Sequence, residues 1–215
     1  MLVSRRGFWL GTAVGAVTLA IPSAYYRNSY SHAKRLRVVT PGRFYRSGQM
    51  TADGFREAVR RFDIKTVINL QEEDRDPFMP VAWLGKPSVL ESELCKSLGV
   101  RYVSIDGGEL IPPDAAAAGE RPRSIDKFLA VLDVPAAYPV LIHCKAGLHR
   151  TGLMTAIYRM EFENWSTAAA VREMRANGFG DFSCTTENVY LVQFVQHYRK
   201  GVRLTAGSAG KGGPP

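Results

Sequence analysis

A short apolar run leads directly into a cysteine, a five-residue turn and an arginine at the start of a predicted helix. The run is Val140–His143, the cysteine is Cys144 and the arginine is Arg150. Branched apolar residues over so few positions are typical of a buried strand. A strand that passes through a tight turn into a helix is the local unit of an α/β fold. This unit constrains the fold more than any other part of the 215-residue chain.

The rest of the chain continues the alternation of strands and helices. Further short strands are predicted at Phe44–Arg46, Thr66–Leu70 and Arg101–Ile105. Helices are predicted over Asp53–Phe62, from a Ser88–Glu91 capping box to before Gly99, and over Ser124–Leu132, Thr151–Asn164, Ser166–Asn177 and Glu187–Gly201. The alternation predicts a single α/β domain with a central, mostly parallel sheet of four to five strands flanked by helices. In such sheets, ligands bind at the carboxyl ends of the strands.

The N-terminus has the pattern of an export signal. Arg5 and Arg6 precede a run from Gly7 to Tyr26 that contains no charged residue. Paired arginines before an apolar, Gly/Ala-rich run resemble a twin-arginine signal. The run is also long enough to span a bilayer, which needs ~20 residues. Residues 1–26 are therefore predicted to be a signal or a membrane anchor, with the domain periplasmic or otherwise extracytoplasmic, or anchored at the inner membrane.

Two polar segments frame the predicted domain of residues 38–203. Residues 27–37 are basic and are predicted to be a linker. Residues 204–215 contain four Gly and two Pro and are predicted to be a flexible tail.

Composition narrows the class of protein. Hydrophobic residues form 46% of the chain, which excludes a wholly disordered protein, and three cysteines are too few for a disulfide-built scaffold. The net charge of +8 favours anionic partners. Nucleic acid is not expected among them, because no Lys/Arg stripe interleaved with aromatic residues occurs.

The turn after the predicted strand has the residues of an anion site. The backbone N–H groups of Lys145, Ala146, Gly147, Leu148, His149 and Arg150 can converge on one point above a helix N-terminus. The planar fork of Arg150 can hold two phosphate oxygens. The same positive field favours the thiolate form of Cys144, the predicted nucleophile. Thr151 is expected to hydrogen-bond the sulfur, and His143 is expected to brace the loop.

These residues carry a resemblance to a known family. The sequence His143-Cys-Lys-Ala-Gly-Leu-His-Arg-Thr-Gly152 resembles the signature of cysteine-dependent protein tyrosine and dual-specificity phosphatases. It is similar to the atypical dual-specificity branch, whose members include enzymes acting on phosphoinositides and inositol phosphates. The resemblance extends over most of residues 38–198, including Phe44–Gln49, Val67–Leu70, Ile157–Met160 and Trp165-Ser166. It implies a phosphatase P-loop between a strand and a helix, and hydrolysis of phosphoric monoesters through a phosphocysteine intermediate.

The resemblance also implies a general acid on a neighbouring loop. Asp106 is preferred, because it follows a predicted strand and precedes two glycines that allow loop movement. Glu109 and Asp114 are the alternatives, and the loop lacks the Trp-Pro-Asp run found in many family members.

The substrate is left open between two classes. Lys145, His149, Arg46 and Arg75 predict a basic pocket, which suits inositol phosphates or phosphoinositide headgroups; phosphotyrosine or phosphoprotein is an equal competitor. Leu148 stands where many loops of this branch have Lys. The alternative function is a catalytically silent phosphate-binding module tethered at the membrane, which would not need a thiolate.

No metal or other cofactor is expected. His143, Cys144 and His149 lack a second Cys/His cluster that would complete a tetrahedral site. Cys95 and Cys184 are predicted to be inert core thiols, and the sequence leaves any disulfide among the three cysteines undetermined.

Overall fold

The structure, a computed structural model, describes residues 5–73, 88–105, 121–180 and 189–203. A five-stranded sheet with the order β1-β2-β5-β3-β4 forms its centre. The strands are β1 Arg37–Thr40, β2 Phe44–Gly48, β3 Thr66–Asn69, β4 Arg101–Ser104 and β5 Val140–Cys144. β1 is antiparallel to β2, and all other neighbouring strands are parallel. The predicted α/β fold with a mostly parallel sheet is confirmed.

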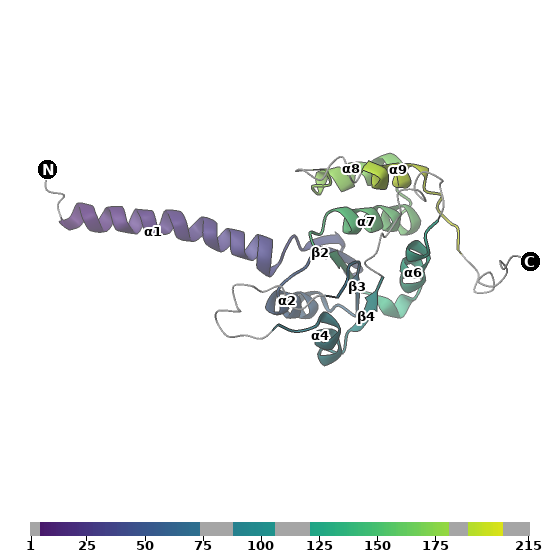
Figure 1. The fold of residues 1–215 in the computed structure, drawn as a ribbon, viewed down its shortest axis with the longest axis horizontal. Helices are drawn as coiled ribbons and strands as arrows, with labels where there is room; N and C mark the ends of the chain where they lie inside the picture. Colours follow the sequence, from purple (N-terminus) through teal and green to yellow (C-terminus); the bar gives the residue numbers. More distant parts are fainter. Residues whose placement is uncertain (1–4, 74–87, 106–120, 181–188, 204–215) are drawn as a thin grey trace, which may run out of the picture.

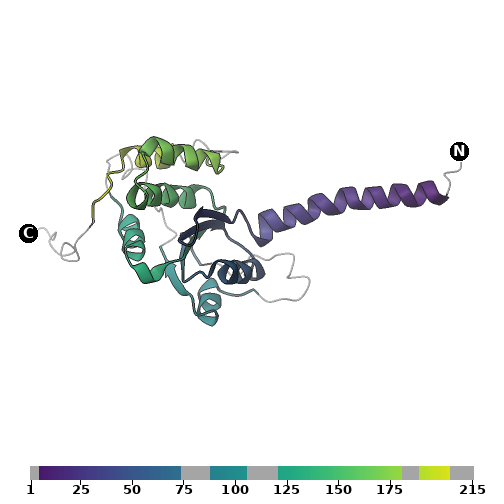
Figure 2. The same ribbon diagram turned by 180° about the vertical axis from the view of Figure 1, so that it is seen from behind.

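Helices cover both faces of the sheet (Figures 1 and 2). The helices of the domain are α2 Ala52–Phe62, α4 Glu91–Ser97, α6 Arg123–Leu132, α7 His149–Phe162, α8 Thr167–Ala176 and α9 Val189–His197, and a 3-10 turn spans Pro135–Ala137. One apolar core joins the sheet to α6, α7, α8 and α9, and a second joins it to α2 and α4. Because strand side chains alternate between faces, each strand contributes to both cores.

β5 is central because it is apolar on both faces. All five of its residues are buried. Leu141 packs in the core under α2 and α4, whereas Ile142 and Cys144 pack in the core under α7. Helix α7 is buried over most of its length, since it lies between the sheet and the helices α8 and α9. It begins at His149, two residues earlier than predicted, and therefore contains Arg150 in its first turn.

The strand register brings several strand ends to one edge of the sheet. Gly48 at the end of β2 lies opposite Cys144, and Asn69 at the end of β3 lies opposite His143. β4 does not neighbour β5, because β3 lies between them. The strand that precedes Asp106 is therefore separated from the strand of Cys144 by one strand. The connection through α6 returns the chain to the position between β2 and β3. Asp106, Glu109 and Asp114 themselves lie outside the described residues.

The N-terminal helix extends away from the domain (Figure 1). Helix α1 spans Arg5–Arg27 and is exposed along its whole length. With the π-helical turn at Asn28–His32 that follows it, this segment is long and apolar enough to cross a membrane, as a signal sequence also is.

The segment expected to be a linker contacts the domain. The Nε2 atom of His32 lies within hydrogen-bond distance, 2.9 Å, of a carboxylate oxygen of Glu57 on α2. A Cβ atom on Gly54 of α2 would clash with the carbonyl oxygen of His32, so glycine is needed where the segment crosses the helix. Arg37, at the end of the expected linker, begins β1, a strand that the sequence analysis does not anticipate. In this strand Val38 pairs with Tyr45 and Thr40 with Phe44, and the register shifts at Val39 between them.

The capping box predicted at Ser88 and Glu91 is wrong. Helix α4 begins at Glu91, and its N-cap is Leu90, which makes no side-chain capping bond. The Glu91 carboxylate bonds two side chains from other elements instead of its own helix end. A tertiary contact has therefore replaced the local one.

Replacement of Phe44 by alanine should test the packing of the larger core. Phe44 is fully buried, stacked on Tyr158 at 4.1 Å and edge-on to Phe128 at 6.3 Å. Phe44→Ala should lower the free energy of unfolding by about 3–5 kcal/mol, measured by chemical denaturation. Val38→Ala, on a half-exposed strand residue, is the control and should cost less than about 1 kcal/mol. Equal losses in the two variants would contradict the assigned core.

Candidate active site

A short loop joins the buried end of β5 to the N-terminus of α7. Cys144 is the last residue of β5 and is 5% exposed, while Lys145 is exposed. Residues 145–148 turn the chain, and α7 begins at His149, where the N-cap residue Leu148 makes no side-chain capping bond. Free N–H groups and a partial positive charge meet at such a helix start. The structure thus brings the predicted nucleophile to the predicted anion site.

The loop packs tightly against the end of β2. Gly147 has φ +73°, and a Cβ atom there would lie 2.5 Å from the Gly48 nitrogen and 2.7 Å from the Ser47 carbonyl oxygen. Only glycine fits this approach. The Gly147 carbonyl accepts a hydrogen bond of 2.9 Å from the Arg46 guanidinium.

Arg46 lies beneath the loop and not on the pocket surface, where the sequence analysis expected it. It is 3% exposed and shares a sheet face with Ile142 and Cys144, since its register partner is Ile142. Burial is the main cause that lowers the pKa of Arg46 to about 10, so it keeps its charge at neutral pH. A buried cation therefore supports the loop from the same side of the sheet as the nucleophile.

Arg150 and Thr151 occupy the first turn of α7. The Arg150 guanidinium donates a 3.0 Å hydrogen bond to the carbonyl of Leu70, just after β3. This bond fixes the orientation of the half-buried guanidinium and leaves further donors available. Thr151 is fully buried, and its hydroxyl has no hydrogen-bond partner among the residues that the structure describes.

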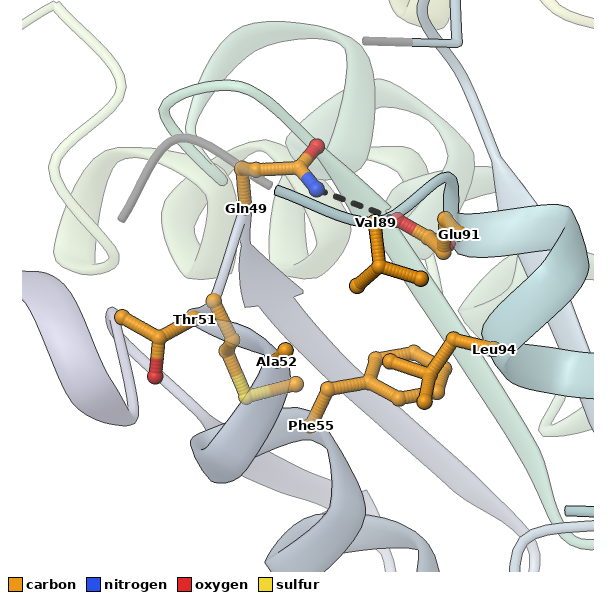
Figure 3. Close-up of a pocket in the computed structure, with 8 residues that line it drawn as sticks. Gln49, Thr51, Ala52, Phe55, Val89, Glu91 and Leu94 are labelled. Carbon is orange, nitrogen blue, oxygen red and sulfur yellow. Dashed lines mark hydrogen bonds between the residues drawn. The ribbon is translucent and has the colours of Figure 1, made fainter. Parts of the chain in front are cut away.

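His143 is held from the opposite face of the sheet. Its Nε2 lies 2.7 Å from a carboxylate oxygen of Glu91, and both side chains are buried. The other Glu91 oxygen accepts a 3.1 Å hydrogen bond from the Gln49 amide, which Figure 3 shows pointing at Glu91 beside a small pocket. The apolar floor of that pocket includes Phe55 and Leu94. Hydrogen bonds thus connect Gln49 and Glu91 to His143, the residue before Cys144.

Glu91 is the site residue that the sequence analysis missed. Its spacing from Ser88 offered a local explanation, and its contact with His143 joins residues 52 positions apart. The sequence signal that could have indicated this role is the helical spacing of Glu91 from Leu94 and Cys95, which places an acidic residue on the face of α4 that packs on the core. Both of those neighbours are buried. A carboxylate in such a place needs a partner.

His149 adds little charge to the pocket. Its ring lies edge-on to Phe179 at 5.4 Å, and burial lowers its pKa below the usual histidine range. The imidazole is therefore neutral at neutral pH, in contrast to the expected basic role. Arg75 lies outside the described residues.

Comparisons with known proteins agree with this geometry. The model of the family described as a DSP-PTPase phosphatase fused to NAD+ kinase matches residues 23–190. The dual specificity protein phosphatase TpbA of Pseudomonas aeruginosa (strain UCBPP-PA14) is 30% identical over 176 residues, which cover 81% of this chain and 69% of that protein.

Solved structures share the fold. The crystal structure of P. aeruginosa TpbA has a TM-score of 0.51 and 26% identity, covering 78% of this chain and 86% of that chain. The core catalytic domain of the PP-IP phosphatase SIW14 from S. cerevisiae has a TM-score of 0.55 and 22% identity, covering 77% and 86% respectively. With the loop geometry and the family match, these findings show that the chain belongs to the DSP-PTPase phosphatases and is a cysteine-dependent phosphatase.

Proposed function

We propose that this chain hydrolyses phosphoric monoesters through a phosphocysteine intermediate on Cys144. The observation that carries the proposal is the position of Cys144 at the end of β5, one short loop before the start of α7, which has Arg150 in its first turn. A nucleophile and an anion site are thus adjacent. A site that only bound phosphate would need the second feature alone.

In the first step, the Cys144 thiolate attacks phosphorus and the bond to the ester oxygen breaks. The N–H groups of residues 145–150 and the Arg150 fork bind the non-bridging oxygens, whose charge they stabilise in the transition state. The departing alcohol takes a proton from a general acid, for which we retain Asp106. In the second step, water attacks the phosphocysteine, its proton returns to that carboxylate, and inorganic phosphate and the thiolate are released.

Two neighbours of Cys144 have supporting roles in this proposal. The Thr151 hydroxyl is buried and unpartnered among the described residues, and it is available to hydrogen-bond the sulfur when Cys144 leaves. His143 keeps the strand end in place through its bond to Glu91. We assign both residues to positioning the nucleophile.

The proposed substrates follow the two classes named by the relatives. TpbA is a dual specificity protein phosphatase, and SIW14 is a PP-IP phosphatase. We propose phosphoproteins and inositol phosphates as the classes to test. The exposed Lys145 at the loop favours substrates with further negative charge.

The Cys144→Ser variant should test the covalent mechanism. A serine hydroxyl is a poor nucleophile here, so turnover of para-nitrophenyl phosphate should fall by more than about 10³-fold, while inorganic phosphate still binds. Cys95→Ala, which removes the other described thiol, should retain activity. Binding of phosphate by the wild-type protein without any turnover would instead support the silent phosphate-binding module.

The general acid should be identified by its dependence on the leaving group. Asp106→Asn should lower kcat by roughly 10²–10⁴-fold for an alkyl phosphate, whose leaving group needs a proton. The loss should shrink for an activated aryl phosphate. Glu109→Gln and Asp114→Asn are the comparison variants. If only one of these two shows the leaving-group-dependent loss, the acid lies further along the chain than Asp106.

We further propose that the N-terminal segment directs export by the twin-arginine route, placing the domain in the periplasm or at the inner membrane. The support is the arginine pair ahead of an apolar helix that is exposed along its whole length. A helix with such a surface is stable against lipid or a translocation apparatus rather than in water.

Replacement of both arginines by lysine should test this route. Arg5→Lys with Arg6→Lys keeps the charge but removes the guanidinium pair, so the precursor should accumulate in the cytoplasm on cell fractionation. Lys34→Arg is a charge-conserving control outside the apolar run and should be exported normally. Normal export of the double variant would exclude the twin-arginine route.

A further inference from the structure

The backbone between the N-terminal helix and the domain reaches the phosphate loop. The Gly48 N–H donates a 2.7 Å hydrogen bond to the Lys34 carbonyl. The Arg35 guanidinium donates a 2.9 Å hydrogen bond to the Ala146 carbonyl, within the loop. Because Gly48 lies opposite Cys144 in the register of the sheet, these bonds place the segment next to the nucleophile.

An unusual backbone turn holds the two cations in this position. Lys34 and Arg35 are consecutive non-glycine residues with positive φ, at +25° and +58°. Such backbone is costly for side chains with a Cβ atom and occurs preferentially at functional sites. The turn is stabilised by a 3.1 Å hydrogen bond from the Arg35 N–H to the Ser29 carbonyl and by the Tyr30 ring beside the guanidinium.

The side chain of Lys34 lies against the end of β2. A Cβ atom on Gly48 would lie 2.9 Å from Cγ of Lys34 and 3.0 Å from the Ala146 carbonyl oxygen. The lysine stem, the strand end and the phosphate loop therefore meet at Gly48. The absence of a side chain at Gly48 makes room for the lysine.

The amine of Lys34 is within electrostatic range of the site. Burial, followed by the charges of Arg35 and Lys145, lowers the pKa of Lys34. The backbone places both lysines at the same strand end, because the Lys34 carbonyl accepts a hydrogen bond from the Gly48 N–H and the Lys145 carbonyl accepts one of 3.2 Å from the N–H of the next residue, Gln49. Two cations are brought together at a cost, and an additional anion between them would relieve their repulsion.

We propose that Lys34, together with Lys145, forms a second anion subsite beside the phosphate loop, which selects substrates carrying another phosphate next to the scissile one. The proposal rests on the phosphatase function proposed above and adds a specificity-determining residue to it. The ligand chemistry is that of a multiply phosphorylated ring, whether free as an inositol phosphate or displayed as a lipid headgroup. Arg35 acts through its bond to Ala146 and fixes the loop relative to this subsite.

The test compares substrates with one and with several phosphates on the full-length chain. Lys34→Met keeps the stem and removes the charge. It should raise KM for myo-inositol hexakisphosphate by about tenfold or more, the usual effect of losing one charge-assisted hydrogen bond. Its effect on kcat/KM for para-nitrophenyl phosphate should be several times smaller. Lys34→Arg keeps the charge and should therefore retain most of the wild-type KM for myo-inositol hexakisphosphate.

A lysine at the amino end of β3, the end of the sheet opposite to the phosphate loop, provides the matched control. Lys65 is exposed, pairs with Asp63 and precedes β3. Lys65→Met should therefore leave the kinetic constants for both substrates unchanged. A phosphoinositide in phosphatidylcholine vesicles serves as the lipid arm. If Lys34→Met loses activity on the soluble inositol phosphate, on the vesicles or on both, the subsite is supported. Which of the two substrates is affected identifies the source of the headgroup.

Three results would overturn the proposal. Equal losses on both kinds of substrate would mean that Lys34 only supports the loop. Unchanged activity of Lys34→Met on both kinds of substrate would mean that Lys34 does not belong to the site. Activity of the wild-type chain only on singly phosphorylated substrates, phosphotyrosine peptides included, would exclude multiply phosphorylated rings as the substrate class. A wild-type chain without activity on para-nitrophenyl phosphate would instead contradict the proposed function itself.

Discussion

The close approach of the phosphate loop to the end of β2 is the constraint on which the site depends. Two stretches of backbone, around Gly147 and around Ser47 and Gly48, lie so near each other that no side chain fits between them. The loop is therefore shaped by its neighbouring strand and by the Arg46 bond to its carbonyl, before any ligand arrives. Such preorganisation is what makes a dipole site effective in catalysis, since little reorganisation is needed during the reaction.

The alternation of strand side chains separates two tasks at adjacent residues. Cys144 faces the side of the sheet that holds Arg46 and α7, whereas His143 faces the side that holds Glu91. The nucleophile can therefore stay close to positive charge while its neighbour is anchored by a carboxylate. A negative group on the same face as Cys144 would disfavour the thiolate. The sheet keeps the carboxylate of Glu91 away from that face.

Local sequence patterns were sufficient to predict the fold class and the loop. Contacts between residues far apart in the sequence could not be predicted from them. The apolar run before Cys144, the glycine at 147 and the following helix are each encoded within a few residues, so the sequence predicts them. The order of the strands, and hence the position of β3 between β5 and β4, is not encoded locally. The Glu91–His143 contact is not encoded locally either. The turn at Lys34 and Arg35 has positive φ values but contains no glycine that would have indicated it.

The placement of Cys95 has a consequence for the oxidation chemistry of Cys144. Cys95 lies in the core under α2 and α4, on the other side of the sheet from Cys144, and burial raises its pKa to about 12. It cannot reach the sulfur of Cys144 without unfolding, and its thiol is a weak nucleophile at neutral pH. If peroxide converts Cys144 to a sulfenic acid, Cys95 will not rescue it as an internal disulfide. Within the part of the chain that the structure describes, an oxidised Cys144 therefore has no internal thiol in place to reduce it, and a bound anionic product would keep both peroxide and external thiols away from its sulfur.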